Sequence, residues 1–261
     1  MGTITKALTL LNNFSSQQPQ IGLTEFARLA RRDKATIHRH LTALEQNGFV
    51  EQDPISKNYR LGPALLRLAA VREHTFPIRD AVISKITALS DELGELVHVS
   101  LLQGDMMSPL LHADTQSHGT RVHFDDGEML PLHATSSGIA MLSYGPSELL
   151  QRVLANPMET HTSKTITESK TLCENVEETR SRGYSYSDQG FEEEVCSFAA
   201  PVFDHNQQTV GTVAVALPKS RLTSEKGHEI VMALLKCSEL VSSAFGGVVP
   251  NEIKQVWLHN D

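Results

Sequence analysis

The chain has 261 residues, 40% hydrophobic and 21% charged, which is the composition of a globular protein with one large domain or two ordinary ones. It contains no apolar run of about 18 residues and no recognisable secretion signal, which argues against a membrane span and favours a cytoplasmic protein. The three cysteines are far apart and never in CxxC spacing, which argues against a disulfide framework or a zinc knuckle.

The formal net charge of −8 is unevenly distributed along the chain. Residues 1–75 carry 10 Lys and Arg against 6 Asp and Glu, a balance of +4, whereas the remainder carries 13 against 25, a balance of −12. A basic module that binds nucleic acid, joined to an acidic domain that does not, would give this asymmetry. Chance clustering of charges would give it as well.

The first 62 residues predict a sequence of short helices followed by a hairpin. Residues 4–14 place apolar side chains on one helical face, and a second helix is expected after Thr24 as its N-cap. A third helix is expected over residues 34–46, where Ile37, Leu41 and Leu44 form the apolar stripe. Asn47-Gly48 is a helix stop, since both residues tolerate a left-handed backbone.

The segments FVEQD and YRLG, separated by the polar turn PISKN, predict a β-hairpin. Three helices and a hairpin in this order describe a winged helix-turn-helix domain over residues 1–62. Residues 63–75 begin with proline and predict a linker helix.

From residue 76 the pattern changes to an α+β domain that we expect to extend to residue 250. An amphipathic helix, IRDAVISKITALSDEL, comes first. Helices are expected at about 137–144, 146–155, 170–182 and 224–245. Five apolar runs separated by turns predict a largely antiparallel sheet: LVHVSLL, MMSPLLHA, RVHF, CSFAAPVF and TVGTVAVAL. Residues 251–261 lack a clear period and are expected to form a tail without regular structure.

The stretch KATIHRHL in the third helix contains two histidines, His38 and His40. Residues two apart on a helix diverge by about 200°, so these side chains cannot chelate one metal ion, which needs i, i+3 or i, i+4 spacing. His40 lies next to the buried stripe and is expected to pack inward. The sequence therefore predicts no metal site here.

The opposite, solvent-facing side of this helix has the residue types that read base edges in a DNA groove. We expect base contacts from Lys34, Ala35, Thr36, His38 and Arg39. We expect phosphate contacts, which supply affinity rather than sequence information, from Arg28, Arg31, Arg32, Lys57 and Arg60. The alternative is that these charges only solvate a small helical domain.

Taken together, these segments resemble the IclR-type bacterial transcriptional regulators over roughly residues 3–245. The N-terminal similarity runs through KALTLLNNF, LTEFARLA, KATIHRHLTALEQNGFVEQD and YRLG, and the C-terminal similarity through LPLHATSSGIAML, RSRGYSYSD, CSFAAPVFD and LPKSR. The resemblance implies a homodimer or homotetramer that binds a pseudo-palindromic operator in double-stranded DNA. It also implies a C-terminal GAF-like domain that binds a small metabolite, often an organic acid, and acts on the DNA-binding domains through the linker helix.

The resemblance places the effector contacts in three segments. The first is the loop HATSSG, which supplies His133, Ser136, Ser137 and Gly138, and where free N–H groups at a helix N-terminus favour a carboxylate. An ordinary serine N-cap is the equal alternative. In the second segment, where the family often has an acidic residue and a cysteine, the matching positions hold Ser187 and Ser197. Asp188 and Cys196 are one residue away, so a register shift would restore both. The third segment supplies Ala214 and Ala216.

If this register is right, several polar contacts for a small acid such as glyoxylate or pyruvate are missing, while the anion-binding loop remains. We therefore expect an effector with one carboxylate and a larger apolar body, such as an aromatic acid or a longer acyl compound. Repression is the commoner mode of action in the family.

The sequence leaves two other classes of function as alternatives. An enzyme is disfavoured because ATSSGIA lacks the first glycine of a GxSxG elbow and because Cys196 has no nucleophile signature. DDGE at 125–128 is too short for a calcium loop. No cofactor is expected, but a metal at the clustered histidines stays open: these are His98, His112, His118, His123 and His133. A DNA-associated protein without an effector is the second alternative.

Overall fold

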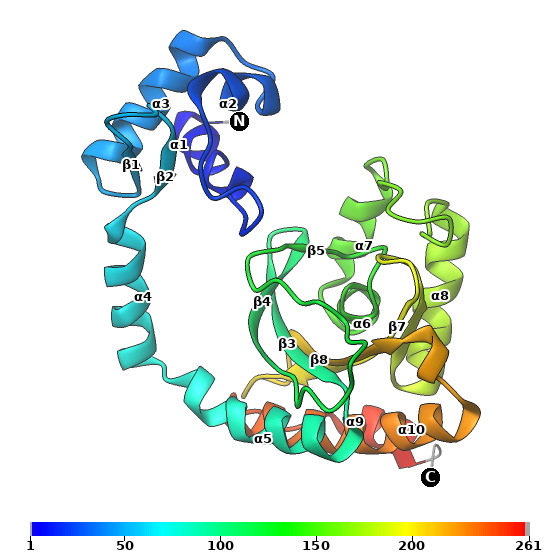
Figure 1. The fold of residues 1–261 in the computed structure, drawn as a ribbon. Helices are drawn as coiled ribbons and strands as arrows, with labels where there is room; N and C mark the ends of the chain where they lie inside the picture. The colour runs from blue at the N-terminus through cyan, green and yellow to red at the C-terminus, as the bar shows by residue number, and fades with distance from the viewer. Residues whose placement is uncertain (1, 259–261) are drawn as a thin grey trace. The chain divides into compact units, whose positions relative to one another are not determined.

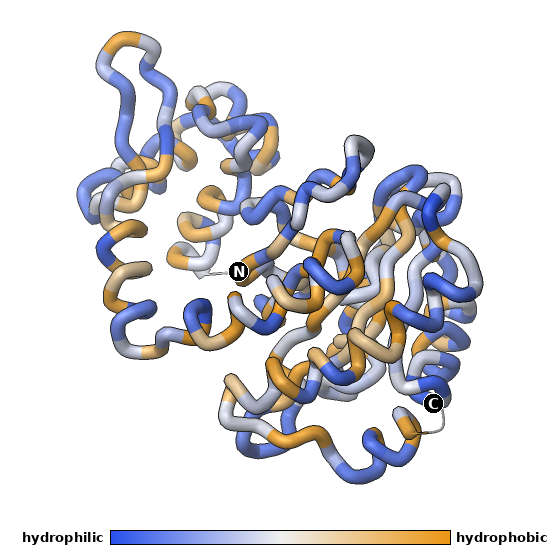
Figure 2. Tube along the Cα trace, turned by 60° about the horizontal axis from the view of Figure 1, so that its bottom comes forward, coloured by the Kyte–Doolittle hydropathy of each residue, from blue (hydrophilic) through white to orange (hydrophobic). Residues whose placement is uncertain are grey.

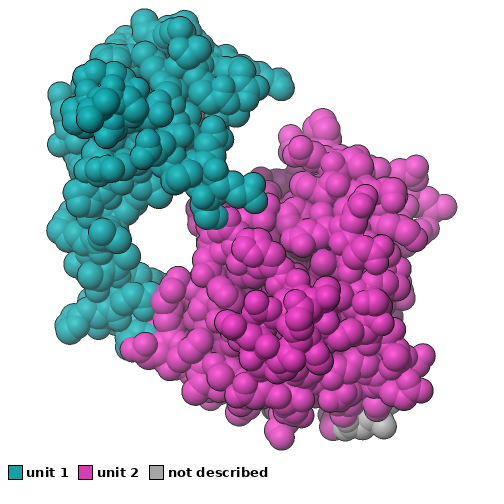
Figure 3. Space-filling view, in the orientation of Figure 1, with its two compact units in different colours: residues 1–77 teal, residues 78–261 magenta. Residues whose placement is uncertain are grey.

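The computed structural model describes residues 2–258, and the internal contacts divide the chain into two compact units, residues 1–77 and 78–261 (Figure 3). The expected combination of a winged helix-turn-helix with a mixed α+β domain built on an antiparallel sheet is confirmed. Among the described residues, no helix is long and apolar enough to cross a lipid bilayer.

The first unit contains four helices and a small hairpin (Figure 1). The helices are α1 (Thr3–Leu8), α2 (Leu23–Leu29), α3 (Lys34–Gln46) and α4 (Pro63–Thr75), with a 3-10 turn at Leu11–Asn13. The hairpin pairs β1 (Val50–Gln52) with β2 (Tyr59–Leu61) in antiparallel register. The ring of Phe26 makes edge contacts with Phe14 and Tyr59, at centroid distances of 5.5 and 6.3 Å.

Two details of this unit differ from the sequence prediction. Residues 4–14 do not form one helix, because Thr9 and Asn13 hydrogen bond to nearby backbone carbonyls and so compete with the helical ladder. Helix α2 begins at Leu23 with Gly22 as its N-cap, so Thr24 is not the cap. Helix α3 matches the prediction at both ends, and Asp33 caps it by accepting a hydrogen bond from the Thr36 backbone N–H at 2.8 Å.

The second unit is built on a six-stranded antiparallel sheet in the order β5-β4-β3-β8-β7-β6. Its strands are β3 (Leu96–Gln103), β4 (Met106–Ala113), β5 (Leu130–Pro131), β6 (Ser185–Asp188), β7 (Val195–Phe203) and β8 (Thr209–Pro218). Its helices are α5 (Ile78–Leu93), α6 (Ser136–Tyr144), α7 (Ser147–Leu154), α8 (Ser169–Arg182), α9 (Ser224–Ala244) and α10 (Asn251–Leu258).

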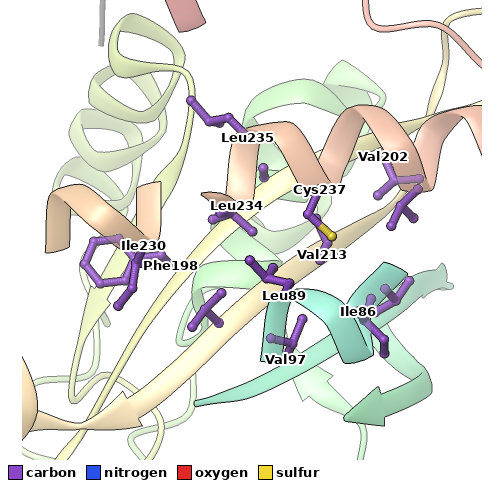
Figure 4. Packing of buried hydrophobic residues seen from close by; sticks show 14 of the residues in the cluster. Ile86, Leu89, Val97, Phe198, Val202, Val213, Ile230, Leu234, Leu235 and Cys237 are labelled. Atoms are coloured by element: carbon purple, nitrogen blue, oxygen red, sulfur yellow. The ribbon is translucent and has the colours of Figure 1, made fainter. Parts of the chain in front are cut away.

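One face of this sheet packs against α5 and α9 and contains the main core (Figure 4). Side chains such as Val97, Phe198 and Val213 from the strands meet Ile86 of α5 and Leu234 of α9, all nearly inaccessible to solvent. Hydrophobic residues alternate with hydrophilic ones along the helices (Figure 2), as expected where one face of a helix is buried.

The other face of the sheet packs against α6. Ala140 of α6 contacts Ala199 of β7 and Ala214 of β8, all fully buried. Small side chains on both elements allow the helix to approach the sheet closely, since no large side chain separates the two backbones. This face positions the N-terminus of α6 against the strands.

Two expectations about strands need correction. The segment RVHF (121–124) is not a strand; it lies in the long connection between β4 and β5, where the Phe124 ring stacks on His98 at a centroid distance of 4.5 Å. Residues 185–188, which the sequence did not mark as a strand, form the edge strand β6. Because β6 contains mostly polar side chains, its hydrophobicity pattern does not predict a strand.

The expected tail without regular structure is wrong for residues 251–258, which form α10; residues 259–261 lie outside the described residues. Trp257 is only 6% exposed, and its indole N–H donates to the Gly183 carbonyl at 2.8 Å. Gly183 has φ +86°, and a Cβ there would lie 2.5 Å from the indole. The buried Trp257 therefore anchors α10 to the glycine that ends α8.

We predict that Trp257→Ala lowers the free energy of unfolding by about 3–5 kcal/mol, because a large buried side chain and its hydrogen bond are lost. The matched control is Leu258→Ala, one residue along the same helix, where the side chain is 61% exposed and a change of less than about 1 kcal/mol is expected. Urea unfolding of both variants measures the difference. Equal, small effects would show that α10 does not stabilise the unit.

Candidate functional site

The solvent-facing side of α3 carries the predicted base-contacting residues. Lys34, Ala35, His38 and Arg39 are exposed, and Thr36 is half-buried. The Arg39 guanidinium lies 3.4 Å from the Thr36 hydroxyl. The structure therefore brings these five side chains together on one helical surface. His40 is half-buried beside the core stripe, which agrees with its interpretation as a packing residue.

The predicted phosphate-contacting residues fall into two groups. Arg28 and Arg60 are paired with carboxylates of their own unit, Arg28 with Glu25 at 2.5 Å and Arg60 with Glu51 at 2.6 Å. Their charges are therefore partly neutralised before any anion arrives. Arg31, Arg32 and Lys57 are exposed without an ion pair among the described residues.

A concave surface runs between α1 and α3 within the first unit. Arg32, Thr36 and Arg39 line it together with Lys6 of α1. Lys6 is not among the residues that the sequence predicts to contact DNA. Only the packing of α1 against α3 brings this lysine to the same surface, so no local pattern pointed to it.

The second unit contains a cavity between the sheet, the N-terminus of α6 and the loops that precede β5 and β7. Its lining residues surround about 580 Å³ of space without protein atoms, part of which is open solvent. Its apolar wall is formed by Leu96, Val122, Phe124, Leu130, Phe191, Val195 and Ala216. Its polar wall is formed by His98, His123, Asp125, Glu128, Thr135, Ser136, Ser137, Ser187, Glu192 and Ser197, with the backbone of Gly190 between them.

The N-terminus of α6 opens on this cavity. The helix begins at Ser136, and its N-cap is Thr135, whose hydroxyl accepts a hydrogen bond from the Gly138 N–H at 3.0 Å. The alternative that a serine caps this helix is therefore wrong. Ser137 is 1% exposed, and its Oγ has no hydrogen-bond partner among the described residues. A buried hydroxyl without a partner costs free energy, and a ligand can remove that cost.

Strand alternation decides which of the second-segment candidates reach the cavity. Ser187 pairs with Ser197, and Ser197 pairs with Ala216, so all three share the cavity face. Asp188 and Cys196 form the next pair and therefore point to the opposite face. The expectation that a register shift would bring Asp188 and Cys196 to the effector is corrected.

On that opposite face Asp188 and Cys196 have partners of their own. One carboxylate oxygen of Asp188 accepts from Lys219 Nζ at 2.9 Å and from the Cys196 thiol at 3.2 Å. The ammonium of Lys219 lowers the pKa of Asp188, and burial raises the pKa of the Cys196 thiol. The thiol therefore stays protonated, which makes it a poor nucleophile.

Three further candidates do not line the cavity. The His133 imidazole is hydrogen-bonded to the Glu159 carbonyl at 2.9 Å. Gly138 lies against Leu132, where an added Cβ would come within 2.4 Å of the backbone, so this glycine serves close packing. Ala214 is on the cavity face but lies beneath Ala140 of α6.

His98 of β3 lines the cavity, although it was not among the residues predicted to contact the effector. It is 5% exposed, shares a hydrogen bond with the Ser100 hydroxyl at 3.2 Å and stacks on Phe124. Burial, reinforced by the neighbouring His112, lowers the pKa of His98 to about 3. The imidazole is therefore neutral near pH 7. His98 reaches the cavity because β3 pairs with β8 and sets His98 opposite Ala214. The residues around HATSSG carry no sign of this pairing.

The cavity wall contains three carboxylates, Asp125, Glu128 and Glu192, and no lysine or arginine. Burial and the charge of Glu128 raise the pKa of Glu192. Within residues 2–258, no group of three or more His, Cys, Asp or Glu is arranged to hold a metal ion. The open question of a histidine metal site thus has no geometric support in this part of the chain.

A winged helix-turn-helix with exposed basic side chains on α3, joined to a domain with a partly polar cavity, is typical of DNA-binding regulators. Comparison with known proteins narrows this class. Residues 3–54 match the IclR helix-turn-helix domain, and residues 72–243 match the domain described as bacterial transcriptional regulator IclR C-terminal. The chain belongs to the IclR family of bacterial DNA-binding transcriptional regulators.

Relatives and solved structures agree with this assignment over nearly the whole chain. The transcriptional repressor IclR of Escherichia coli is 27% identical over 94% of this chain and 90% of its own length. A putative IclR regulator from Silicibacter has a TM-score of 0.89 at 39% identity, covering 96% of this chain and 99% of its own. An IclR homolog from Microbacterium hydrocarbonoxydans, complexed with 4-hydroxybenzoate, shares the fold with a TM-score of 0.73 at 18% identity, covering 94% and 99%.

We predict that His98 makes the second unit sensitive to acid. Because the folded-state pKa is depressed from 6.5 to about 3, the unfolded chain binds this proton more readily, and stability is lost as the pH falls from about 6.5 toward 3. In His98→Gln the free energy of unfolding should fall less steeply over this range. Urea unfolding at a series of pH values measures the slope.

The control for this prediction is Ser100→Ala, which removes the hydrogen bond but keeps the imidazole, and which should keep the wild-type pH dependence. If the free energy of unfolding of His98→Gln fell with pH as steeply as in the wild type, His98 would not be the source of the acid sensitivity.

Proposed function

We propose that this protein is a cytoplasmic repressor whose operator binding is modulated by a small organic acid in the cavity of the second unit. Residues 1–62 bind a pseudo-palindromic operator, residues 63–75 form the linker, and residues 76–250 bind the effector and another copy of the chain. The observation that carries the effector proposal is the unpartnered Ser137 hydroxyl beside the N-terminus of α6, within a cavity.

A carboxylate fits the N-terminal end of α6 on electrostatic grounds. The first N–H groups of a helix have no intrahelical acceptors, and the helix dipole contributes roughly half a positive charge there. Ser136 and Ser137 occupy the first turn, so their N–H groups and the Ser137 hydroxyl can donate to one carboxylate. Ser187 and Ser197 add hydroxyls from the sheet.

The remaining wall supports an effector with an apolar body. Leu96, Phe124 and Phe191 supply apolar surface, and Ala216 adds a small apolar side chain. A two-carbon or three-carbon acid would leave this surface in contact with water. Aromatic acids and longer acyl compounds bury it, which is the source of most binding free energy for small ligands.

The linker helix α4 supports a homodimer or homotetramer. None of its residues is buried within the chain, and Leu66 and Val71 are 76% and 54% exposed. Exposed apolar side chains along a whole helix favour contact with another protein surface. A second copy meets the requirement of a two-fold symmetric operator. An effector then acts by binding more tightly to one arrangement of the pair than to the other.

We predict that Arg39→Ala relaxes operator sequence preference by about 1–3 kcal/mol, because a bidentate contact to a base edge is lost. Lys57→Ala should weaken binding to operator and unrelated DNA alike, and should lower the salt slope by about 1, because a phosphate contact is lost. Fluorescence anisotropy on the intergenic DNA beside the gene, at several salt concentrations, measures both.

Arg60→Ala is the control for Lys57→Ala, since Glu51 already neutralises Arg60 and a smaller effect is expected. Equal effects of Arg39→Ala and Lys57→Ala on sequence preference would contradict the placement of α3 in the groove.

We predict that Ser137→Ala reduces effector affinity by roughly tenfold or more, because the hydroxyl contact to the carboxylate is lost and no atom is added to the buried site. The control is Asp188→Asn, which lies on the other face of the sheet and should leave effector affinity unchanged. Thermal-shift and calorimetric titration with a panel of acids measures both variants.

In the same panel, aromatic acids and longer acyl acids should stabilise the protein more than glyoxylate or pyruvate do. Stabilisation by glyoxylate or pyruvate but not by larger acids would overturn the proposed effector class.

A further inference from the structure

The charge of the cavity wall does not suit a simple monoanion. Asp125, Glu128 and Glu192 line the cavity, and no lysine or arginine does. The N-terminus of α6 offers only about half a positive charge. A ligand that carries one carboxylate and nothing else would therefore be attracted at the helix and repelled by the rest of the wall.

Two of these carboxylates lack a positive partner of their own. Among residues 2–258, neither Glu128 nor Glu192 forms an ion pair with a lysine or arginine. Glu192 is half-buried, while Glu128 is exposed at the mouth of the cavity. The imidazole of His123, also on the cavity wall, acts in the opposite direction and lowers the pKa of Glu192. Partial burial beside another carboxylate costs free energy, as the raised pKa of Glu192 indicates.

A second, independent observation shows that this cavity is built for a ligand with polar groups. The Ser137 hydroxyl is 99% buried, lines the same cavity and has no partner in the described part of the chain. An acceptor on the ligand satisfies Ser137, and a cation on the ligand satisfies Glu192. One ligand with both an acceptor and a cation would satisfy the Ser137 hydroxyl and the Glu192 carboxylate together.

We propose that the effector is a zwitterion, with a carboxylate at the N-terminus of α6, an apolar body along Leu96 and Phe124, and a protonated amine held by Glu192 with Glu128. This inference rests on the proposed function, since it assigns a second polar group to the same effector. An ammonium–carboxylate contact in a partly desolvated site raises affinity roughly tenfold to hundredfold over a neutral isostere.

The test is calorimetric titration of the full chain with matched probes. The aromatic set is 4-(aminomethyl)benzoate, 4-methylbenzoate and benzylamine, and the aliphatic set is 6-aminohexanoate, hexanoate and hexylamine. In at least one set the amino acid should bind tenfold or more tightly than the neutral acid, and the amine alone should bind weakly.

Glu192→Gln should abolish the preference for the amino acid while leaving the affinity of the neutral acid unchanged or improved. The matched control is Glu193→Gln, an exposed neighbour that does not line the cavity and should keep the wild-type preference. Circular dichroism and thermal unfolding of both variants verify that each is folded.

The outcomes separate this inference from the proposed function. Neutral acids that bind as tightly as the amino acids, or a preference that survives Glu192→Gln, overturn the zwitterion and leave an acid-binding cavity. Stabilisation by Mg²⁺, Ca²⁺ or Zn²⁺ alone, lost in Glu192→Gln, overturns it in favour of a metal ion. Binding of the amines but of no carboxylate, with no effect of Ser137→Ala, overturns the proposed function itself.

Discussion

The two-residue alternation of the central sheet is the constraint on which the second unit depends. Along β3, β8 and β7, one set of side chains is mostly large and apolar and packs against α5 and α9, while the other set is mostly small or polar. Because successive side chains of a strand point to opposite faces, one register places the core and the cavity at once. A slip of β7 by one residue would turn Phe198 from the core to the cavity face and Ser197 from the cavity to the core.

The cavity follows from the second set of side chains. Alanines on β7 and β8 let α6 approach the sheet where Ala140 packs, and Gly138 lets it approach Leu132. Beyond this contact the small residues Ser187, Ser197 and Ala216 leave a space that no protein atom fills. The sheet thus supports the helix at one point and leaves its N-terminus open to a ligand at another.

Some elements were predictable because their determinants are local. Helix α3 has the expected bounds, since its apolar stripe, its preceding Asp33 and its Asn47-Gly48 stop are all within the segment. The segment RVHF reads as a strand by composition, yet it lies in the connection between β4 and β5, where the Phe124 ring stacks on His98. Helix α10 was missed for the converse reason, because its stability comes from Trp257 packed against Gly183.

The amino-acid sequence by itself determined the two-unit organisation, the recognition helix with its exposed Lys34 to Arg39 face, and the family, because all of these lie in contiguous patterns. The tertiary structure alone decided which residues meet at the cavity. His98, Glu128 and Glu192 come from three distant segments, and Asp188 and Cys196 were excluded by strand pairing. The physical reason is that contacts between strands and loops far apart in the chain depend on register and packing, which no local pattern encodes.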